Sequence, residues 1–118
     1  MTTTNPYPFQ LSNNDGQFTI VADLESDELY DMYFPFFEEH GYEGNGYYWE
    51  GHIIQILEKE DSELLNHLNF DPEAGAFYAY ADSKETQAKF VNLLSPIFSD
   101  LQKLETCITA ADRDRIDD

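Results

Sequence analysis

The amino-acid sequence predicts an α+β fold, a small antiparallel sheet built from two β-hairpins with about three helices packed against it. Two turn-forming segments, residues 13–16 and 71–75, each lie between short apolar stretches that are typical of strands. Elsewhere, apolar residues recur at the three- and four-residue spacing of amphipathic helices. The chain has 118 residues and no linker or internal repeat, so we expect a single domain over residues 1–118.

The first hairpin is predicted over residues 7–23. Its first strand covers residues 7–12, and Asp15-Gly16 after it is a strong signal for a tight hairpin turn. The return strand, residues 17–23, alternates between two faces, as a half-buried strand does. The residues of its apolar face are Phe18, Ile20 and Ala22.

A helix is predicted after Ser26, a residue type that favours the N-cap position, and Asp27 and Glu28 suit the first turn. The apolar face of this helix consists of Leu29, Tyr33, Phe36 and Phe37. Pro35 is expected to kink the helix or to begin a second short one. Gly41 follows and suits a left-handed cap at the helix end.

Residues 41–46 contain three glycines and are predicted to form a loop. The next helix has Trp49 as its core anchor, and Asp61-Ser62 begins a further short turn. The second hairpin pairs residues 69–70 with residues 76–81.

The last helix is predicted to begin at the capping pair Asp82 and Glu85. Its apolar stripe extends to Leu104, and Ser95-Pro96 is expected to kink or restart it. Residues 110–118 are polar and are expected to form a frayed tail.

The charge excludes several kinds of partner. The net charge is −18, and residues 1–58 contain eleven acidic residues but no lysine or arginine. Such a surface repels phosphate backbones and anionic lipid headgroups, so we expect no direct binding to nucleic acid or to membranes. It attracts a basic protein instead. Residues 1–10 lack the regions of a secretory signal, so a cytoplasmic protein is expected.

No catalytic motif stands out in the sequence. His40, His52 and His67 lie far apart and without the spacing of metal ligands, and Cys107 is expected to be a plain thiol. We therefore predict no catalytic residue, no metal site and no cofactor. A small metal-dependent hydrolase that uses His40 or His52 with nearby acids stays open as an alternative.

An aromatic segment is the unusual feature, because nine of the twenty residues from 30 to 49 are aromatic. Phenylalanines are commonly buried, whereas tyrosines beside acids on a loop are typical of protein-binding surfaces. The predicted partner-binding residues are Tyr42, Glu43, Asn45, Tyr47, Tyr48 and Glu50. The other interpretation is that this loop only joins two helices and that its rings cover the base of the loop.

Two runs resemble a known family. They are G-Y-E-G-N-G-Y-Y-W-E at residues 41–50 and F-D-P-E-A-G-A-F at residues 70–77, and the sequence is similar to the immunity protein 51 family of bacterial polymorphic toxin systems. The resemblance extends from about Phe18 to Leu104. It implies a cytoplasmic, non-enzymatic protein that neutralises a cognate toxin by stoichiometric binding.

The leading hypothesis is therefore immunity by protein–protein binding, with an acidic surface that steers a basic toxin domain such as a nuclease. An acidic nucleic-acid mimic or adaptor protein is a further alternative, and the charge is equally compatible with adaptation to high salt. The oligomeric state stays open.

Overall fold

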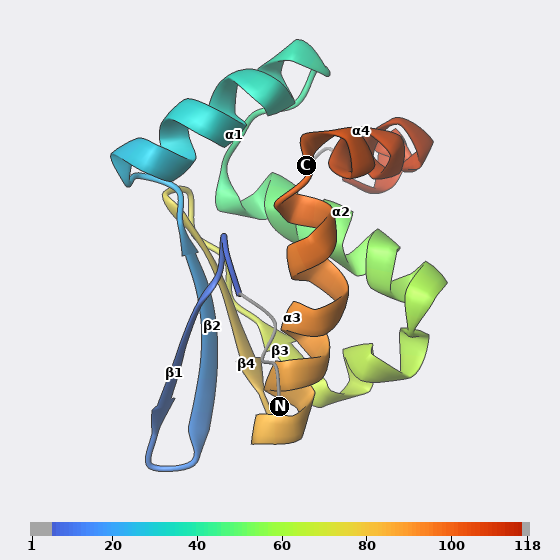
Figure 1. The fold of residues 1–118 in the computed structure, drawn as a ribbon. Coiled ribbons are helices and arrows are strands. Elements are labelled where there is room, and N and C mark those ends of the chain that lie inside the picture. Colours follow the sequence, from blue (N-terminus) through green and yellow to red (C-terminus); the bar gives the residue numbers. More distant parts are fainter. Residues whose placement is uncertain (1–5, 117–118) are drawn as a thin grey trace.

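The centre of the molecule is a four-stranded antiparallel sheet with the strand order β1-β2-β4-β3 (Figure 1). Its strands are β1 (Gln10–Asn14), β2 (Gln17–Asp23), β3 (Leu68–Phe70) and β4 (Ala76–Ala81). The computed structural model describes residues 6–116, so the two ends of the predicted 1–118 domain lie outside it. The two predicted hairpins are present, and pairing of β2 with β4 joins them into one sheet.

The first hairpin closes as the sequence predicts. Asp15 and Gly16 both have positive φ angles, 50° and 81°, as the common two-residue hairpin turn requires at its two central positions. The first strand begins at Gln10, however, and not at residue 7. The backbone N–H of Phe9 donates to the Pro6 carbonyl at 2.7 Å, so the chain turns just before the strand and the Phe9 ring enters the core.

Helices cover one face of the sheet. They are α1 (Asp27–Glu39), α2 (Gly46–Glu60), α3 (Lys84–Phe98) and α4 (Leu101–Ala110), with the short 3₁₀ helices η1 (Ser62–His67) and η2 (Arg113–Arg115). Figure 1 shows α2 and α3 beside the sheet, α1 across one end of it and α4 farther out, where α4 packs against α2 and α3. This arrangement confirms the α+β class.

The alternation of β4 agrees with this layering. Phe77 and Ala79 are fully buried on the helix-covered face, whereas Tyr78 and Tyr80 are half-buried on the opposite face. Successive residues of β4 thus alternate between the core and the opposite face, as the two-residue period of a strand requires.

An aromatic cluster fills the space between the helices and the sheet. The Trp49 ring is fully buried and lies 5.1 Å from Tyr33 and 4.8 Å from Phe98, measured between ring centroids. Phe9 contacts the rings of Trp49, Phe77, Phe90 and Phe98. Trp49 thus anchors α2 in the core, as the sequence predicts.

Of the two options expected at each proline, the start of a new helix is wrong, and a kink stays a prediction. Neither Pro35 nor Pro96 starts a new helix: α1 and α3 continue through them, and both prolines are exposed. Packing of the buried helix faces outweighs the hydrogen bond that each proline removes. The predicted last helix is instead divided three residues after Pro96, where the Asp100 side chain accepts from the N–H groups of Gln102 and Lys103 and caps α4.

The C-terminal segment also differs from the frayed tail that we expect from its polarity. Residues 111–116 lie against α2: the Gln55 side chain pairs with the backbone of Asp112 at 2.9 and 2.7 Å, and Arg115 forms a 2.6 Å ion pair with Glu58. Ile116 is buried in the core. Residues 117–118 of the predicted tail lie outside the described residues.

Candidate partner-binding site

The loop of residues 41–46 connects α1 to α2 and is shaped by its own side chains. Gly41 has a φ of 83° and continues the chain from the end of α1. The Asn45 side chain accepts from the N–H groups of Tyr47 and Tyr48 at 3.0 and 3.1 Å, so it serves as the N-cap of α2. The amide oxygen of Asn45 is thus occupied within the chain.

The two sequence runs that carry the family resemblance meet in space. A Cβ atom placed on Gly46 lies 2.2 Å from the carbonyl oxygens of both Glu73 and Ala76, a distance that no side chain tolerates. The Gly46 N–H also donates to the Ala74 carbonyl at 3.4 Å. Gly46 therefore lets the start of α2 touch the turn between β3 and β4, and this part of the motif has a structural role.

A groove of about 200 Å³ lies beside this junction, and we call it the motif groove. Its lining residues are Leu24, Glu25, Tyr30, Phe34, Gly44, Asn45, Ala74 and Gly75. The rings of Tyr30 and Phe34 stack at 4.8 Å with an interplanar angle of 15°, and Tyr30 is 49% exposed. The groove therefore presents an aromatic wall and the carboxylate of Glu25.

The predicted partner-binding residues did not include Glu25, Tyr30 or Phe34. Tyr30 and Phe34 are four residues apart, so they are neighbours on α1, on a face different from that of its buried residues. That spacing is visible in the sequence and was the available signal. The contact between Glu25 and Gly75, in contrast, joins segments fifty residues apart and has no local signal.

The six residues predicted to bind a partner fall into three groups by their exposure. Glu43 and Tyr47 are exposed, and Tyr47 shows 44% of its surface. Asn45, Tyr48 and Glu50 are half-buried, whereas Tyr42 is only 6% exposed and belongs to the core cluster.

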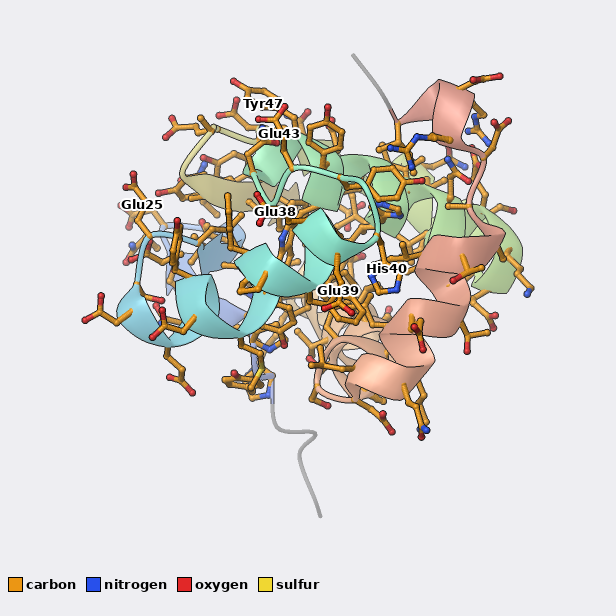
Figure 2. All side chains as sticks on the ribbon, turned by 90° about the horizontal axis from the view of Figure 1, so that it is seen from above. Glu25, Glu38, Glu39, His40, Glu43 and Tyr47 are labelled. Carbon is orange, nitrogen blue, oxygen red and sulfur yellow. The ribbon has the colours of Figure 1, made fainter. Side chains whose placement is uncertain are left out.

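Figure 2 relates the exposed residues to their surroundings. Glu43 and Tyr47 lie close together beside α1, and Glu25 lies toward the other end of that helix. Glu39 and His40 are nearer to α4, where His40 meets Glu105 at 3.1 Å. We use the name α1 surface for the exposed side chains on α1 and next to its two ends, which are Glu25, Tyr30, Glu38, Glu43 and Tyr47.

Tyr42 is held in place by a cation from the C-terminal segment. The guanidinium carbon of Arg113 lies 4.2 Å from the centroid of the Tyr42 ring, and the guanidinium donates to the Gly41 carbonyl. The His52 ring packs against Tyr42 at 4.6 Å and is 1% exposed. Burial, and to a lesser extent the charge of Arg113, lowers the pKa of His52 to about 4.

The chain has few groups arranged for catalysis. Across residues 6–116, no three histidine, cysteine or acidic side chains are grouped closely enough to hold a metal ion. His40 and His67 each face one carboxylate, those of Glu105 and Asp82, and His52 is apart from both in the core. Burial raises the pKa of the Cys107 thiol, which disfavours the reactive thiolate. Over the same residues, no helix has the length and hydrophobicity needed to cross a membrane.

These features describe a small acidic α+β protein with exposed tyrosines and acidic side chains on and beside α1. The protein-family model for immunity protein 51 matches residues 9–113, which is most of the chain, and the chain belongs to that family. No curated protein and no solved structure matches the chain. Membership implies an immunity protein, with a cognate toxin as its partner and a non-enzymatic role.

Proposed function

We propose that this protein binds and neutralises its cognate toxin through the α1 surface, acting in the cytoplasm as a stoichiometric inhibitor. The observation that carries the proposal is that each of two exposed tyrosines lies near an acidic side chain: Tyr30 lines the motif groove with Glu25, and Tyr47 lies close to Glu43 (Figure 2). Tyrosine is among the residues that contribute most binding energy at protein interfaces. The structure thus provides both contact area and charge for a partner.

The charge distribution indicates the nature of the toxin. The first 58 residues contain no lysine or arginine, so neither residue type from that segment lies among the acids of α1. Arg113 and Arg115 approach from the C-terminal segment, but they bind Gly41 and Glu58. A negative surface of this kind accelerates association with a basic toxin domain, and a nuclease with a basic cleft is a suitable partner.

The proposal is tested by co-expression with a candidate toxin domain, sought in the gene directly upstream of this one, and scored for growth rescue and for complex formation. In the variant Glu38→Lys/Glu43→Lys, we expect the association rate constant to fall about tenfold or more at low salt and less at high salt. The control is Glu63→Lys/Glu85→Lys, which changes the net charge equally at two exposed residues near the start of α3.

The control should retain at least about a third of the wild-type association rate, since its charges lie away from the proposed interface. Equal losses in both variants would contradict a localised binding surface. Cell death despite a soluble wild-type protein would contradict immunity itself.

A further inference from the structure

We propose that the motif groove is a receptor for one arginine side chain of a basic protein partner. The proposal rests on the proposed function, because it names the chemical group that the α1 surface recognises. It requires a groove of suitable shape, an acceptor for the guanidinium and an aromatic face for it to stack on.

The shape depends on two glycines. A Cβ atom on Gly75 comes within 2.6 to 2.9 Å of the Glu25 carboxylate, and one on Gly44 comes within 3.1 Å of Phe34. Both glycines therefore leave room for the two side chains that face the groove. Any larger residue at either position pushes Glu25 or Phe34 away from its present place.

The lining is suited to a cation. Glu25 is exposed, and within residues 6–116 its carboxylate takes part in none of the ion pairs, which join His40 to Glu105, His67 to Asp82 and Arg115 to Glu58. None of the eight lining residues is basic, so an anion finds no counter-charge in the groove.

The aromatic wall favours a planar cation over a compact one. Tyr30 and Phe34 are stacked nearly parallel, so each ring covers one face of the other and leaves its outer face for a further planar group, and both rings line the groove with Glu25. A guanidinium stacks on such a surface and donates two parallel hydrogen bonds to a carboxylate, whereas an ammonium group is a more strongly hydrated point charge. Arginine is thus a better occupant than lysine.

The same chain already binds a guanidinium in this way a few residues away. Arg113 lies over the Tyr42 ring at 4.2 Å and donates to the carbonyl of Gly41, so an aromatic face and one oxygen acceptor hold it. The motif groove has an aromatic face and a charged acceptor in place of a neutral one, and charge-assisted hydrogen bonds are roughly twice as strong as neutral ones.

The test is a titration of the ¹⁵N-labelled full-length protein with N-acetyl-arginine amide, followed by amide chemical shifts. N-acetyl-lysine amide serves as the matched probe. We expect saturable shifts centred on the amides of Glu25, Tyr30, Gly44 and Gly75, with the arginine probe binding more tightly than the lysine probe. Glu25→Gln should raise the Kd of the arginine probe about tenfold, and Tyr30→Leu should raise it as well. The control Glu63→Gln, which removes another exposed carboxylate away from the groove, should leave the Kd unchanged.

Equal binding of both probes, shifts spread over the whole acidic surface, or an unchanged Kd in Glu25→Gln would overturn the proposal. The dispersion of the amide spectrum shows whether each variant is folded. Growth rescue separates this proposal from the proposed function. If Glu25→Gln loses the probe but protects as well as the wild type does, the groove does not receive an arginine of the toxin, while immunity stands. If the wild type itself fails to protect, immunity is contradicted, whereas the probe titration is unaffected.

Discussion

The two halves of the 41–46 loop differ in whether the tyrosine beside them is buried or exposed. At the first half, Tyr42 is buried between His52 and the guanidinium of Arg113. At the second half, Gly44 and Asn45 border the motif groove, where Tyr30 is 49% exposed beside the Glu25 carboxylate. The chain thus covers one tyrosine with its own cation and leaves the other beside uncompensated negative charge.

The difference separates stability from recognition. The filled first half joins α1, α2 and the C-terminal segment, and such a contact contributes to folding. The open second half contributes less to folding, because exposed aromatic surface gains little from it, but it leaves area and charge for a partner. Substitutions in the two halves should therefore affect different measurements.

The largest effect is expected at Gly46, the last residue of the loop. Gly46→Ala places a methyl group 2.2 Å from two backbone carbonyl oxygens, so α2 must move away from the β3–β4 turn. We expect a loss of more than about 3 kcal/mol in the free energy of unfolding, at the upper end of the range for overpacking. Urea denaturation measures it.

Gly16→Ala provides the control for this substitution. Gly16 has a φ of 81° but no atom within 4 Å of an added Cβ, so only the cost of a left-handed backbone remains, about 1–2 kcal/mol. Equal losses in the two variants would show that steric contact at Gly46 is unimportant.

The next largest effect is the pH dependence of stability that His52 causes in the filled first half. His52 has a pKa of about 4 when folded, against an ordinary value of 6.5, so the unfolded chain binds its proton first as the pH falls. The contribution of neutral His52 is complete above pH 6.5 and is lost as the pH falls toward 4, by up to about 3 kcal/mol.

His52→Phe should remove this loss, and its stability should exceed that of the wild type by a growing margin as the pH falls. Neither ring nitrogen of His52 has a hydrogen-bond partner within the described part of the chain, so the phenyl ring leaves no group newly unpaired. Denaturation curves between pH 4 and 7 provide the comparison. Parallel pH profiles for the two proteins would contradict a neutral buried His52.

The sequence predicts those parts of the fold that depend on nearby residues. The hairpin at Asp15-Gly16 follows from turn chemistry, and the helices follow from the spacing of apolar residues. The division between α3 and α4 was placed wrongly because Pro96 is the more conspicuous signal, although Asp100, a good N-cap, was also visible.

The candidate site shows where such prediction stops. Exposed and buried residues follow no fixed period in a loop, so the sequence does not predict that Tyr42 points inward. In the structure Tyr42 is covered by Arg113, which lies 71 residues later in the chain. The C-terminal segment looks polar, yet it contributes Ile116 to the core and two arginines to α2 and its loop. The position of Glu25 likewise depends on Gly75. Contacts of this kind come from packing between distant segments and leave no pattern in a single sequence.

The smallest effect is expected from removing the cation of the filled half. Arg113→Met loses the hydrogen bond to Gly41 and the contact with the Tyr42 ring, and we expect it to lower the free energy of unfolding by about 1 kcal/mol. Arg115→Met is the matched control, because it removes an equal charge from an exposed pair with Glu58, an interaction of about 0–1 kcal/mol.

Two further measurements on Arg113→Met test whether the two halves of the loop are independent. The charge of Arg113 contributes to the low pKa of His52, so in Arg113→Met the pKa should rise, and the acid-induced loss of stability should end nearer to pH 6.5 and be smaller. The Kd of N-acetyl-arginine amide for the motif groove should stay unchanged, because Arg113 is not among the residues that line it. If the Kd changed as much as it does in Glu25→Gln, the two halves of the loop would be energetically coupled, and recognition would depend on the same contacts as folding.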